Sequence, residues 1–183
     1  MEKKNNSVIR IALIGPESTA KSTLSEALAL HYKTVWVREY SRNYLSAINR
    51  KYTLEDILTI AKEQLEQEKK ALIHANRLLF ADTELIISKV WCEDVFQTCP
   101  PWITEKLEEF KYDFYLLTYP DLAWEQDDVR ENPNRRAFFY DWYESELQRI
   151  HADYAVIKGD GKVRFDNCIT AIENFLAVSK FNL

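Results

Sequence analysis

The chain contains five short apolar runs, rich in β-branched and aromatic residues, with helical periodicity between them. The runs are Val8 to Ile14, Thr34 to Val37, Leu78 to Ala81, Tyr112 to Thr118 and Tyr154 to Lys158. Short continuous apolar runs are typical of strands that are buried on both faces. Strands that alternate with helices predict an α/β fold, in which helices cover both faces of a five-stranded parallel sheet.

The segment between the second and third runs predicts one long helix. Thr53-Leu-Glu-Asp56 resembles a capping box, and apolar residues follow at helical spacing. They are Leu54, Ile57, Leu58, Ala61, Leu65 and Leu72. The opposite face contains Glu66-Gln-Glu-Lys-Lys70, and we expect these residues to be solvated.

The stretch GPESTAKST, residues 15 to 23, is close to the phosphate-binding pattern G-x-x-x-x-G-K-[ST]. It joins the first predicted strand to the N-terminus of a predicted helix, where free N–H groups attract an anion. We therefore expect a nucleotide-binding loop rather than a turn that happens to contain a lysine. Its expected binding residues are Gly15, Glu17, Ser18, Thr19, Ala20, Lys21, Ser22 and Thr23.

Ala20 stands where the phosphate-binding pattern has glycine. If the loop needs a positive φ at this position, an L-residue costs about 1–2 kcal/mol, which a folded domain can carry. The alanine adds only one methyl group near the phosphates. We expect the loop to bind nucleotide despite this departure.

Acidic residues follow the second and third predicted strands, at the edge where parallel sheets bind ligands. Glu39 is a candidate base for a hydroxyl that attacks a γ-phosphate. An ion pair with Arg38 or another neighbour is an equally good interpretation of Glu39. Asp82 is a candidate Mg²⁺ ligand opposite Ser22, although aspartate is also a favoured helix N-cap.

A polar segment, residues 124 to 136, follows the fourth predicted strand. Its arginines are predicted to close over the phosphates and to neutralise charge during transfer. They are Arg130, Arg135 and Arg136. Trp124 offers a flat face for a ring, and the alternative is a solvated loop with Trp124 in the core.

Gly159 and Gly161 follow the fifth predicted strand. They predict a tight turn, which is either a turn that admits the nucleotide base close to the backbone or a plain turn. His31, His74 and His151 show no spacing that suggests a metal site or a catalytic dyad.

Composition narrows the class of protein. A length of 183 residues suits one domain, residues 1–183, with a polar tail at residues 1–7. The sequence shows no apolar leader or bilayer-spanning stretch, so we expect a cytoplasmic protein with no membrane partner. A formal net charge of −5 argues against general electrostatic binding to nucleic acid. Homo-oligomerisation stays open.

Among proteins with such a loop, a small-molecule kinase fits best. The sequence contains no D-x-x-G motif, and the fourth strand leads into Thr118-Tyr-Pro-Asp121 instead of N-K-x-D, so a regulatory GTPase fits poorly. Motor ATPases usually follow the strand aspartate directly with a glutamate, whereas Thr83 separates Asp82 from Glu84 here. A kinase must exclude water and use a substrate hydroxyl.

Six stretches together resemble the ribosylnicotinamide kinase domain of bacterial NadR-type proteins. They are GPESTAKSTL, VREYSR, ADTE, KVWCEDVF, YDFYLLTYPD and WEQDDVRENPNRR, and the resemblance runs from about Ile11 to Phe175. It implies a three-layer P-loop NTPase fold of the nucleoside and nucleotide kinase type. It also implies transfer of the γ-phosphoryl group of ATP to the 5′-hydroxyl of nicotinamide riboside, which gives nicotinamide mononucleotide.

The resemblance also implies roles for single residues. The phosphate and Mg²⁺ residues of the family match Lys21, Ser22 and Thr23. Asp82 matches a carboxylate near the metal and the substrate, and Trp124 matches a tryptophan that stacks on the nicotinamide ring. Glu39 stands at the position of the base. The expected catalytic residues are Lys21, Glu39, Asp82, Arg130 and Arg135. The expected acceptor-binding residues are Glu39, Tyr40, Asp82, Trp124 and Asp127. Arg136, Gly159 and Gly161 are expected to contact ATP, and Ser22 and Asp82 to hold Mg²⁺.

Two departures from the family limit what is carried over. Ala20 replaces the usual glycine, and Glu84 stands where some members repeat an aspartate. We expect neither the adenylyltransferase activity nor the transcriptional role of the multifunctional proteins. A kinase for another nucleoside, and a regulatory protein that holds ATP without turnover, are the alternatives.

Overall fold

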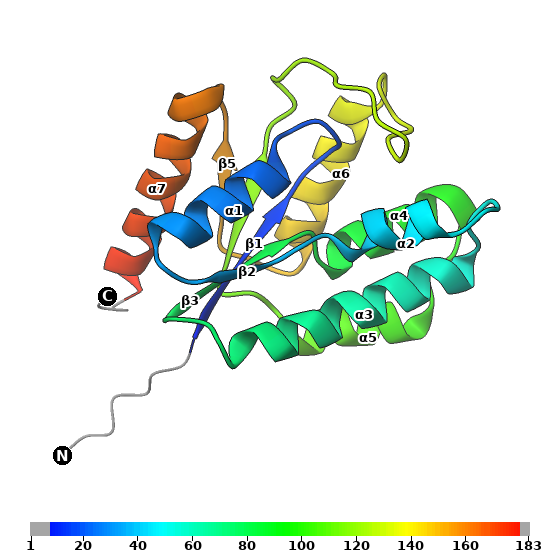
Figure 1. The fold of residues 1–183 in the computed structure, drawn as a ribbon, viewed down its shortest axis with the longest axis horizontal. Coiled ribbons are helices and arrows are strands. Elements are labelled where there is room, and N and C mark those ends of the chain that lie inside the picture. The colour runs from blue at the N-terminus through cyan, green and yellow to red at the C-terminus, as the bar shows by residue number, and fades with distance from the viewer. Residues whose placement is uncertain (1–7, 180–183) are drawn as a thin grey trace.

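The computed structural model describes residues 8–179 (Figure 1). Parallel strands form one sheet in the order β2-β3-β1-β4-β5, which confirms the predicted five-stranded parallel sheet. The strands are β1 (Ile9–Ile14), β2 (Val35–Val37), β3 (Leu78–Asp82), β4 (Phe114–Thr118) and β5 (Tyr154–Ile157). The central position of β1 places the loop that follows it at the middle of the sheet edge.

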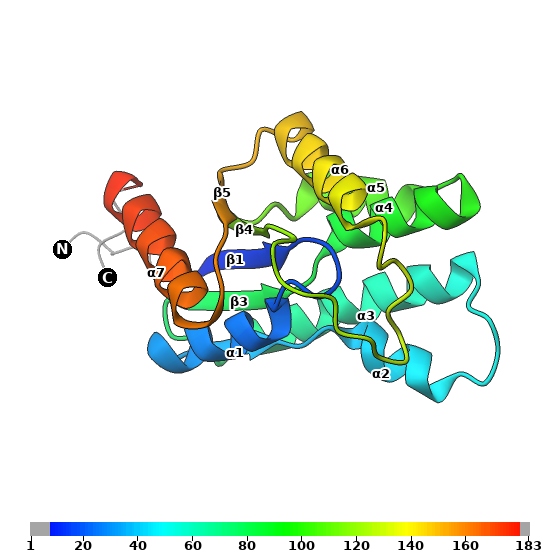
Figure 2. The same ribbon diagram turned by 90° about the horizontal axis from the view of Figure 1, so that it is seen from above.

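Helices cover both faces of this sheet (Figure 2). They are α1 (Lys21–His31), α2 (Tyr40–Ala47), α3 (Leu54–Leu72), α4 (Leu85–Phe96), α5 (Pro101–Glu109), α6 (Arg136–Arg149) and α7 (Gly161–Val178). On one face, Leu28 of α1 and Ile172 of α7 pack against strand residues such as Phe80. On the other face, residues of α3, α4, α5 and α6 pack around Tyr115 and its neighbours. Because both faces are covered, the strand sequences are largely apolar, with Arg10 in β1 and Asp82 at the end of β3 as charged exceptions.

The predicted strand boundaries differ from the observed ones by one or two residues. β1 and β2 begin one residue later, β3 includes Asp82, and β5 ends one residue earlier. β4 begins at Phe114 rather than Tyr112, because the Tyr112 N–H donates to the Tyr115 hydroxyl at 3.4 Å instead of entering the ladder.

The long helix α3 begins as predicted with a capping box. The Thr53 hydroxyl accepts from the Asp56 N–H, and the Asp56 carboxylate accepts from the Thr53 N–H at 2.7 Å. The prediction that residues 66–70 are all solvated is wrong at Glu68, which is buried and pairs with Arg10 of β1 at 3.5 Å. Burial raises the pKa of Glu68 to about 7. The helical pattern does not reveal this pair because Arg10 lies on a distant strand.

No helix within residues 8–179 combines the length and apolarity needed to cross a membrane.

Candidate active site

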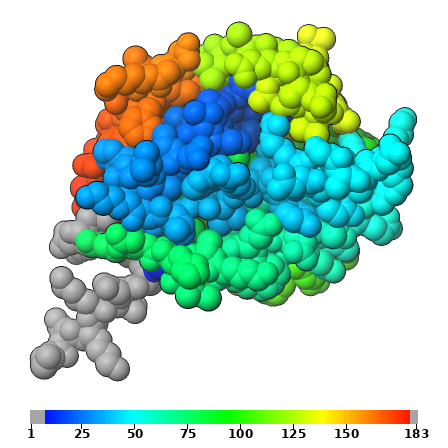
Figure 3. Space-filling model, viewed as in Figure 1, coloured from blue at the N-terminus to red at the C-terminus, as the bar shows by residue number. Residues whose placement is uncertain are grey.

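A cavity of about 940 Å³ opens at the carboxyl end of the sheet. It is lined by the loop after β1, the start of α2, the start of α7 and the segment between β4 and α6, which we call the lid segment (residues 119–135). Figure 3 shows the surface hollowed where the dark blue, cyan and yellow-green residues meet. Ligand pockets usually measure about 300–1,000 Å³, so this cavity has room for a nucleotide and a second small molecule.

The loop after β1 forms the floor of the cavity. Ala20 adopts a φ of 65° and a ψ of 24°, which is the left-handed conformation that glycine adopts without strain. The alanine therefore carries the expected strain of about 1–2 kcal/mol. The next residue, Lys21, begins α1, so the N-terminus of this helix faces the cavity.

Thr118 at the end of β4 supports this loop from below. Its hydroxyl oxygen lies 3.1 Å from the Ile14 carbonyl oxygen and 2.7 Å from the Thr19 hydroxyl oxygen. Thr19 in turn donates to the Pro16 carbonyl at 2.8 Å. Thr118 is not among the predicted site residues, because its only signal in the sequence is its position at the end of a buried strand.

The Lys21 ammonium lies inside the loop, 2.8 Å from the Gly15 carbonyl oxygen and 2.9 Å from that of Pro16. Burial lowers the pKa of Lys21, and the negative charges of Glu39, Asp82 and Glu17 oppose this shift. These carboxylates therefore share one electrostatic environment with the lysine.

Asp82 at the end of β3 is almost completely buried, with 1% of its surface exposed. Within the described residues, neither of its carboxylate oxygens completes a hydrogen bond. Burial and the nearby Glu39 raise the pKa of Asp82 to about 6, whereas Lys21 and the Ser22 hydroxyl act in the opposite direction. The helix N-cap that we considered for Asp82 is instead Glu84, whose carboxylate accepts from the Ile86 N–H at 2.8 Å.

A buried carboxylate without partners, next to a hydroxyl, fits a hard cation that prefers oxygen ligands. Asp82 and Ser22 are therefore suited to hold Mg²⁺. Among residues 8–179, no group of three or more His, Cys, Asp or Glu side chains could hold a metal ion. Mg²⁺ at this position would thus depend on phosphate oxygens, as it does in many phosphoryl-transfer sites.

Glu39 ends the loop between β2 and α2 and lines the cavity. Its carboxylate accepts from the Ser41 hydroxyl at 2.6 Å and pairs with Arg42 at 3.2 Å. The ion-pair partner of Glu39 is therefore Arg42 and not Arg38, because the Arg38 guanidinium lies over the Trp36 ring at 5.3 Å. The pair holds Glu39 in the cavity wall.

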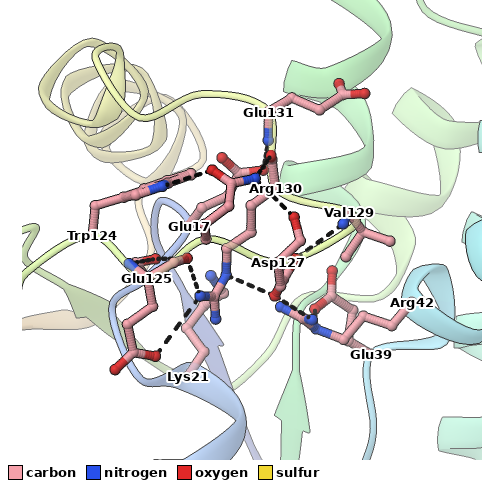
Figure 4. Close-up of polar contacts among 12 residues, drawn as sticks. Glu17, Lys21, Glu39, Arg42, Trp124, Glu125, Asp127, Val129, Arg130 and Glu131 are labelled. Atoms are coloured by element: carbon pink, nitrogen blue, oxygen red, sulfur yellow. Dashed lines mark hydrogen bonds and ion pairs between the residues drawn. The ribbon is translucent and has the colours of Figure 1, made fainter.

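Asp127 connects the lid segment to α2 (Figure 4). Its carboxylate pairs with Arg42 at 2.8 Å and with Arg130 at 3.0 Å. Although burial acts in the opposite direction, the hydrogen bond from Arg42 holds the pKa of Asp127 below its usual value. Arg42 and Arg130 line the cavity, whereas Asp127 does not.

The lid segment is also hydrogen-bonded to the phosphate loop. The Glu17 carboxylate accepts from the backbone N–H groups of Glu131 at 3.1 Å and Asn132 at 2.9 Å. The Glu125 N–H donates to the Ser18 hydroxyl at 3.1 Å. The predicted lid thus lies over the loop rather than away from it.

The remaining predicted lid residues have other partners. Arg135 pairs through two nitrogens with Asp94 of α4 and stacks on Phe139 at 4.7 Å. Arg136 donates to the Leu122 carbonyl at 2.8 Å. Trp124 is half-buried, donates to Gln126 and lies 6.0 Å from the Arg136 guanidinium, and it is not among the residues that line the cavity.

Four aromatic side chains, none of them among the predicted site residues, line the end of the cavity near α4 and α6. They are Tyr52, Trp91, Phe139 and Tyr143, and we call this set the aromatic compartment. The Tyr52 and Trp91 rings meet edge to face at 4.9 Å. Asp94, which pairs with Arg135, also lines this end. These residues look like core positions in the sequence, because aromatic residues at helical spacing usually are.

The predicted turn after β5 forms, with positive φ at Gly159 and Gly161. Asp121 accepts from the Gly159 N–H at 2.8 Å and pairs with Arg164, which is buried and also donates to the Gly159 carbonyl. Gly161 lines the cavity and Gly159 does not. Tyr40 lies outside the cavity lining, and its N–H donates to Gln64 of α3 at 2.9 Å.

Residues 10–164 match the model of a protein family described as an AAA domain. The chain belongs to this family. The match includes the phosphate loop, all strands of the sheet and the lid segment.

The resemblance to NadR-type proteins is confirmed by comparison with known proteins. The trifunctional NAD biosynthesis/regulator protein NadR of Salmonella typhimurium is 25% identical over 177 residues, which cover 91% of this chain and 42% of the relative. NadR of Escherichia coli is 27% identical over 126 residues, 66% of this chain and 30% of that relative. The chain thus spans less than half the length of these curated relatives.

Solved structures show the same fold. A crystal structure of NadR in complex with NAD and AMP-PNP has a TM-score of 0.74 and 20% identity, over 92% of this chain and 50% of that chain. A NadR structure in complex with nicotinamide riboside (NR) has a TM-score of 0.73, with the same identity and coverage. Deoxyadenosine kinase from M. mycoides has a TM-score of 0.63 and 12% identity, over 91% of this chain and all of that chain. The fold is therefore the P-loop fold of nucleoside and nucleotide kinases.

Proposed function

We propose that this protein is an ATP- and Mg²⁺-dependent kinase that phosphorylates the 5′-hydroxyl of nicotinamide riboside. The observation that carries this proposal is the position of Glu39. Its carboxylate lines the same cavity as the phosphate loop, and it is close enough to Lys21 and Asp82 to shift the pKa of both. A carboxylate at this position suits a base that takes the proton of an attacking hydroxyl.

Each part of the site has a role in this transfer. Lys21 and the N–H groups of the loop hold the β- and γ-phosphates, and Arg130 neutralises the charge that develops on the transferred group. Ser22 and Asp82 would hold Mg²⁺, which would offset the negative charge of the phosphates. Glu39 accepts the proton of the 5′-hydroxyl as the new phosphate ester forms and ADP leaves.

The aromatic compartment supports a flat, cationic acceptor ring. The nicotinamide ring of the riboside carries a positive charge, and aromatic faces attract cations. Asp94 adds a carboxylate to the same end of the cavity. That a NadR protein binds nicotinamide riboside supports the same acceptor for this chain.

The lid segment supports kinase chemistry rather than hydrolysis. Hydrogen bonds from the backbone N–H groups of Glu125 and Glu131 hold it against the phosphate loop, beside the cavity. A lid that closes over bound substrates excludes water, which would otherwise compete with the acceptor hydroxyl.

The test is release of ADP from purified protein with ATP and Mg²⁺, in parallel with nicotinamide riboside, other nucleosides and no acceptor. We expect ADP only with nicotinamide riboside, together with an equal amount of mononucleotide. Turnover with a different nucleoside that equals or exceeds the turnover with nicotinamide riboside would show that nicotinamide riboside is not the specific acceptor. ATP binding without release of ADP under any condition would support the regulatory alternative.

A further inference from the structure

Arg42 extends from the first turn of α2 into the cavity. Its guanidinium pairs with Glu39 at 3.2 Å and with Asp127 at 2.8 Å, and 39% of its side chain stays exposed. Glu39 is the proposed base, and Asp127 belongs to the lid segment. Arg42 therefore lies between the acceptor side of the site and the lid.

Three cations from different elements line this part of the cavity. They are Lys21 of the phosphate loop, Arg42 of α2 and Arg130 of the lid segment. Arg42 lines the same cavity as Lys21, and its guanidinium is paired with Glu39, the proposed base. Arg42 is thus placed between the phosphate loop and the proposed position of the acceptor hydroxyl.

One carboxylate, that of Asp127, holds both Arg42 and Arg130. The two guanidiniums approach it from α2 and from the lid segment (Figure 4). A phosphoryl group also binds between two arginines in this way, because the paired N–H groups of a guanidinium match phosphate oxygens. The arginine that remains half-exposed after this pairing has N–H donors left for a second anion.

We propose that Arg42 binds the transferred phosphoryl group from the acceptor side and then holds the 5′-phosphate of the product. This inference rests on the proposed function. Lys21 and Arg130 hold the phosphoryl group on the donor side, so Arg42 would accompany it as its bond to ADP breaks and its bond to the acceptor oxygen forms. The sequence offers a signal for this residue, because Arg42 lies one helical turn after Glu39.

A purely structural role for Arg42, as a clamp on the lid segment, makes a different prediction. A clamp would affect the nucleoside and its 5′-phosphate equally, since both occupy the same covered cavity. A phosphate ligand would affect only the 5′-phosphate. The ratio of the two affinities therefore separates the roles without any measurement of turnover.

The experiment is calorimetric titration of wild-type protein and Arg42→Gln with nicotinamide riboside and with nicotinamide mononucleotide. We expect the variant to bind the mononucleotide roughly 10- to 100-fold more weakly, which is the usual effect of a lost charged hydrogen bond. Its affinity for the riboside should change less than about threefold. The matched control is Arg38→Gln, which should leave both affinities unchanged because Arg38 stacks on Trp36 outside the cavity lining.

Arg42→Lys is the second variant if the glutamine variant does not fold. Lysine keeps the charge but not the fork, so we expect an intermediate loss that is again confined to the mononucleotide. Equal weakening of both ligands, or of neither, in either folded variant would overturn the role of Arg42. Wild-type protein that binds neither ligand would instead overturn the acceptor assignment, and this inference with it.

Discussion

A Cβ atom at Gly15 would lie 2.2 Å from the hydroxyl oxygen of Thr118 and 2.7 Å from its carbonyl oxygen. Real Cβ atoms do not approach oxygen so closely, and Gly15 also has a φ of 146°. The first residue of the phosphate loop and the last residue of β4 therefore fix each other's positions. Thr118 can support Thr19 and Ile14 only because position 15 has no side chain.

Gly15→Ala should therefore displace the phosphate loop. We expect loss of detectable ATP binding and a fall in the free energy of unfolding of roughly 3 kcal/mol, as for overpacking of a core. Gly161→Ala is the matched control for the stability measurement, because its φ is 47° but a Cβ there meets nothing within 4 Å. Its cost should be only about 1 kcal/mol. Thermal unfolding and ATP titration measure both effects, and equal behaviour of the two variants would contradict the prediction.

Ala20→Gly should relieve the left-handed strain at the start of α1. We expect ATP affinity within about threefold of wild type, and the free energy of unfolding should change by no more than about 1 kcal/mol. The relieved strain is offset because glycine gains entropy in the unfolded chain. A large gain in affinity or turnover would show that alanine detunes the loop.

Glu39→Gln should lower kcat by roughly 10²–10⁴ if Glu39 is the base, with ATP affinity little changed. Glutamine keeps the size of the side chain and its bond from Ser41. Glu26→Gln, at an exposed position on α1, should leave kcat unchanged. An unchanged rate in Glu39→Gln would leave Glu39 only its ion pair with Arg42.

Glu17→Ala should loosen the lid segment, because it removes the acceptor of two backbone N–H groups. We expect KM for ATP to rise about tenfold, as for one lost charged hydrogen bond, and the lid segment to be cleaved faster by protease. Asp128→Ala is the control, since Asp128 is an exposed residue of the same lid segment that does not line the cavity. Identical protease sensitivity in the two variants would show that Glu17 does not hold the lid.

The stability of the protein should depend on the protonation of Glu84. Burial raises the pKa of this side chain to about 8, above its ordinary value of 4.5. A carboxyl group with a raised pKa stabilises the fold fully below 4.5, and this contribution is lost as pH rises to about 8, by at most about 1.4 kcal/mol per pH unit.

Glu84→Gln should therefore flatten the fall in the free energy of unfolding between pH 5 and 8. Glutamine can still accept from the Ile86 N–H, so the cap of α4 remains. Denaturant titration at several pH values gives the comparison. A slope as steep as that of wild type would assign the pH dependence to other buried acids, such as Glu68.

The sheet could be predicted from sequence because its strands are largely apolar, and the three central ones, β1, β3 and β4, are buried on both faces. The phosphate loop and the capping box of α3 were equally accessible, since both are local patterns. Glu68 was missed because its partner, Arg10, comes from a strand 58 residues away in the chain.

The acceptor end of the site could not be predicted from local patterns. Tyr52, in the loop before α3, meets Trp91 of α4 only when the tertiary structure forms, and an aromatic residue on a helix, such as Trp91, usually indicates core. Sequence also could not show that Arg135 pairs with Asp94 or that Trp124 stays outside the cavity lining. These outcomes depend on how the lid segment folds back, which no periodicity encodes.

If ATP binds with its base at the turn after β5, the structure of this turn affects the choice of nucleobase. Its shape is fixed from beneath by buried Arg164 and by Asp121, while Gly161 exposes backbone to the cavity. A base that meets backbone atoms there is selected by the curvature of the chain rather than by an exchangeable side chain. The preference for one purine base over another would then change only if the packing around Arg164 also changed. Base preference would therefore evolve slowly, whereas the residues at the acceptor end could diverge freely.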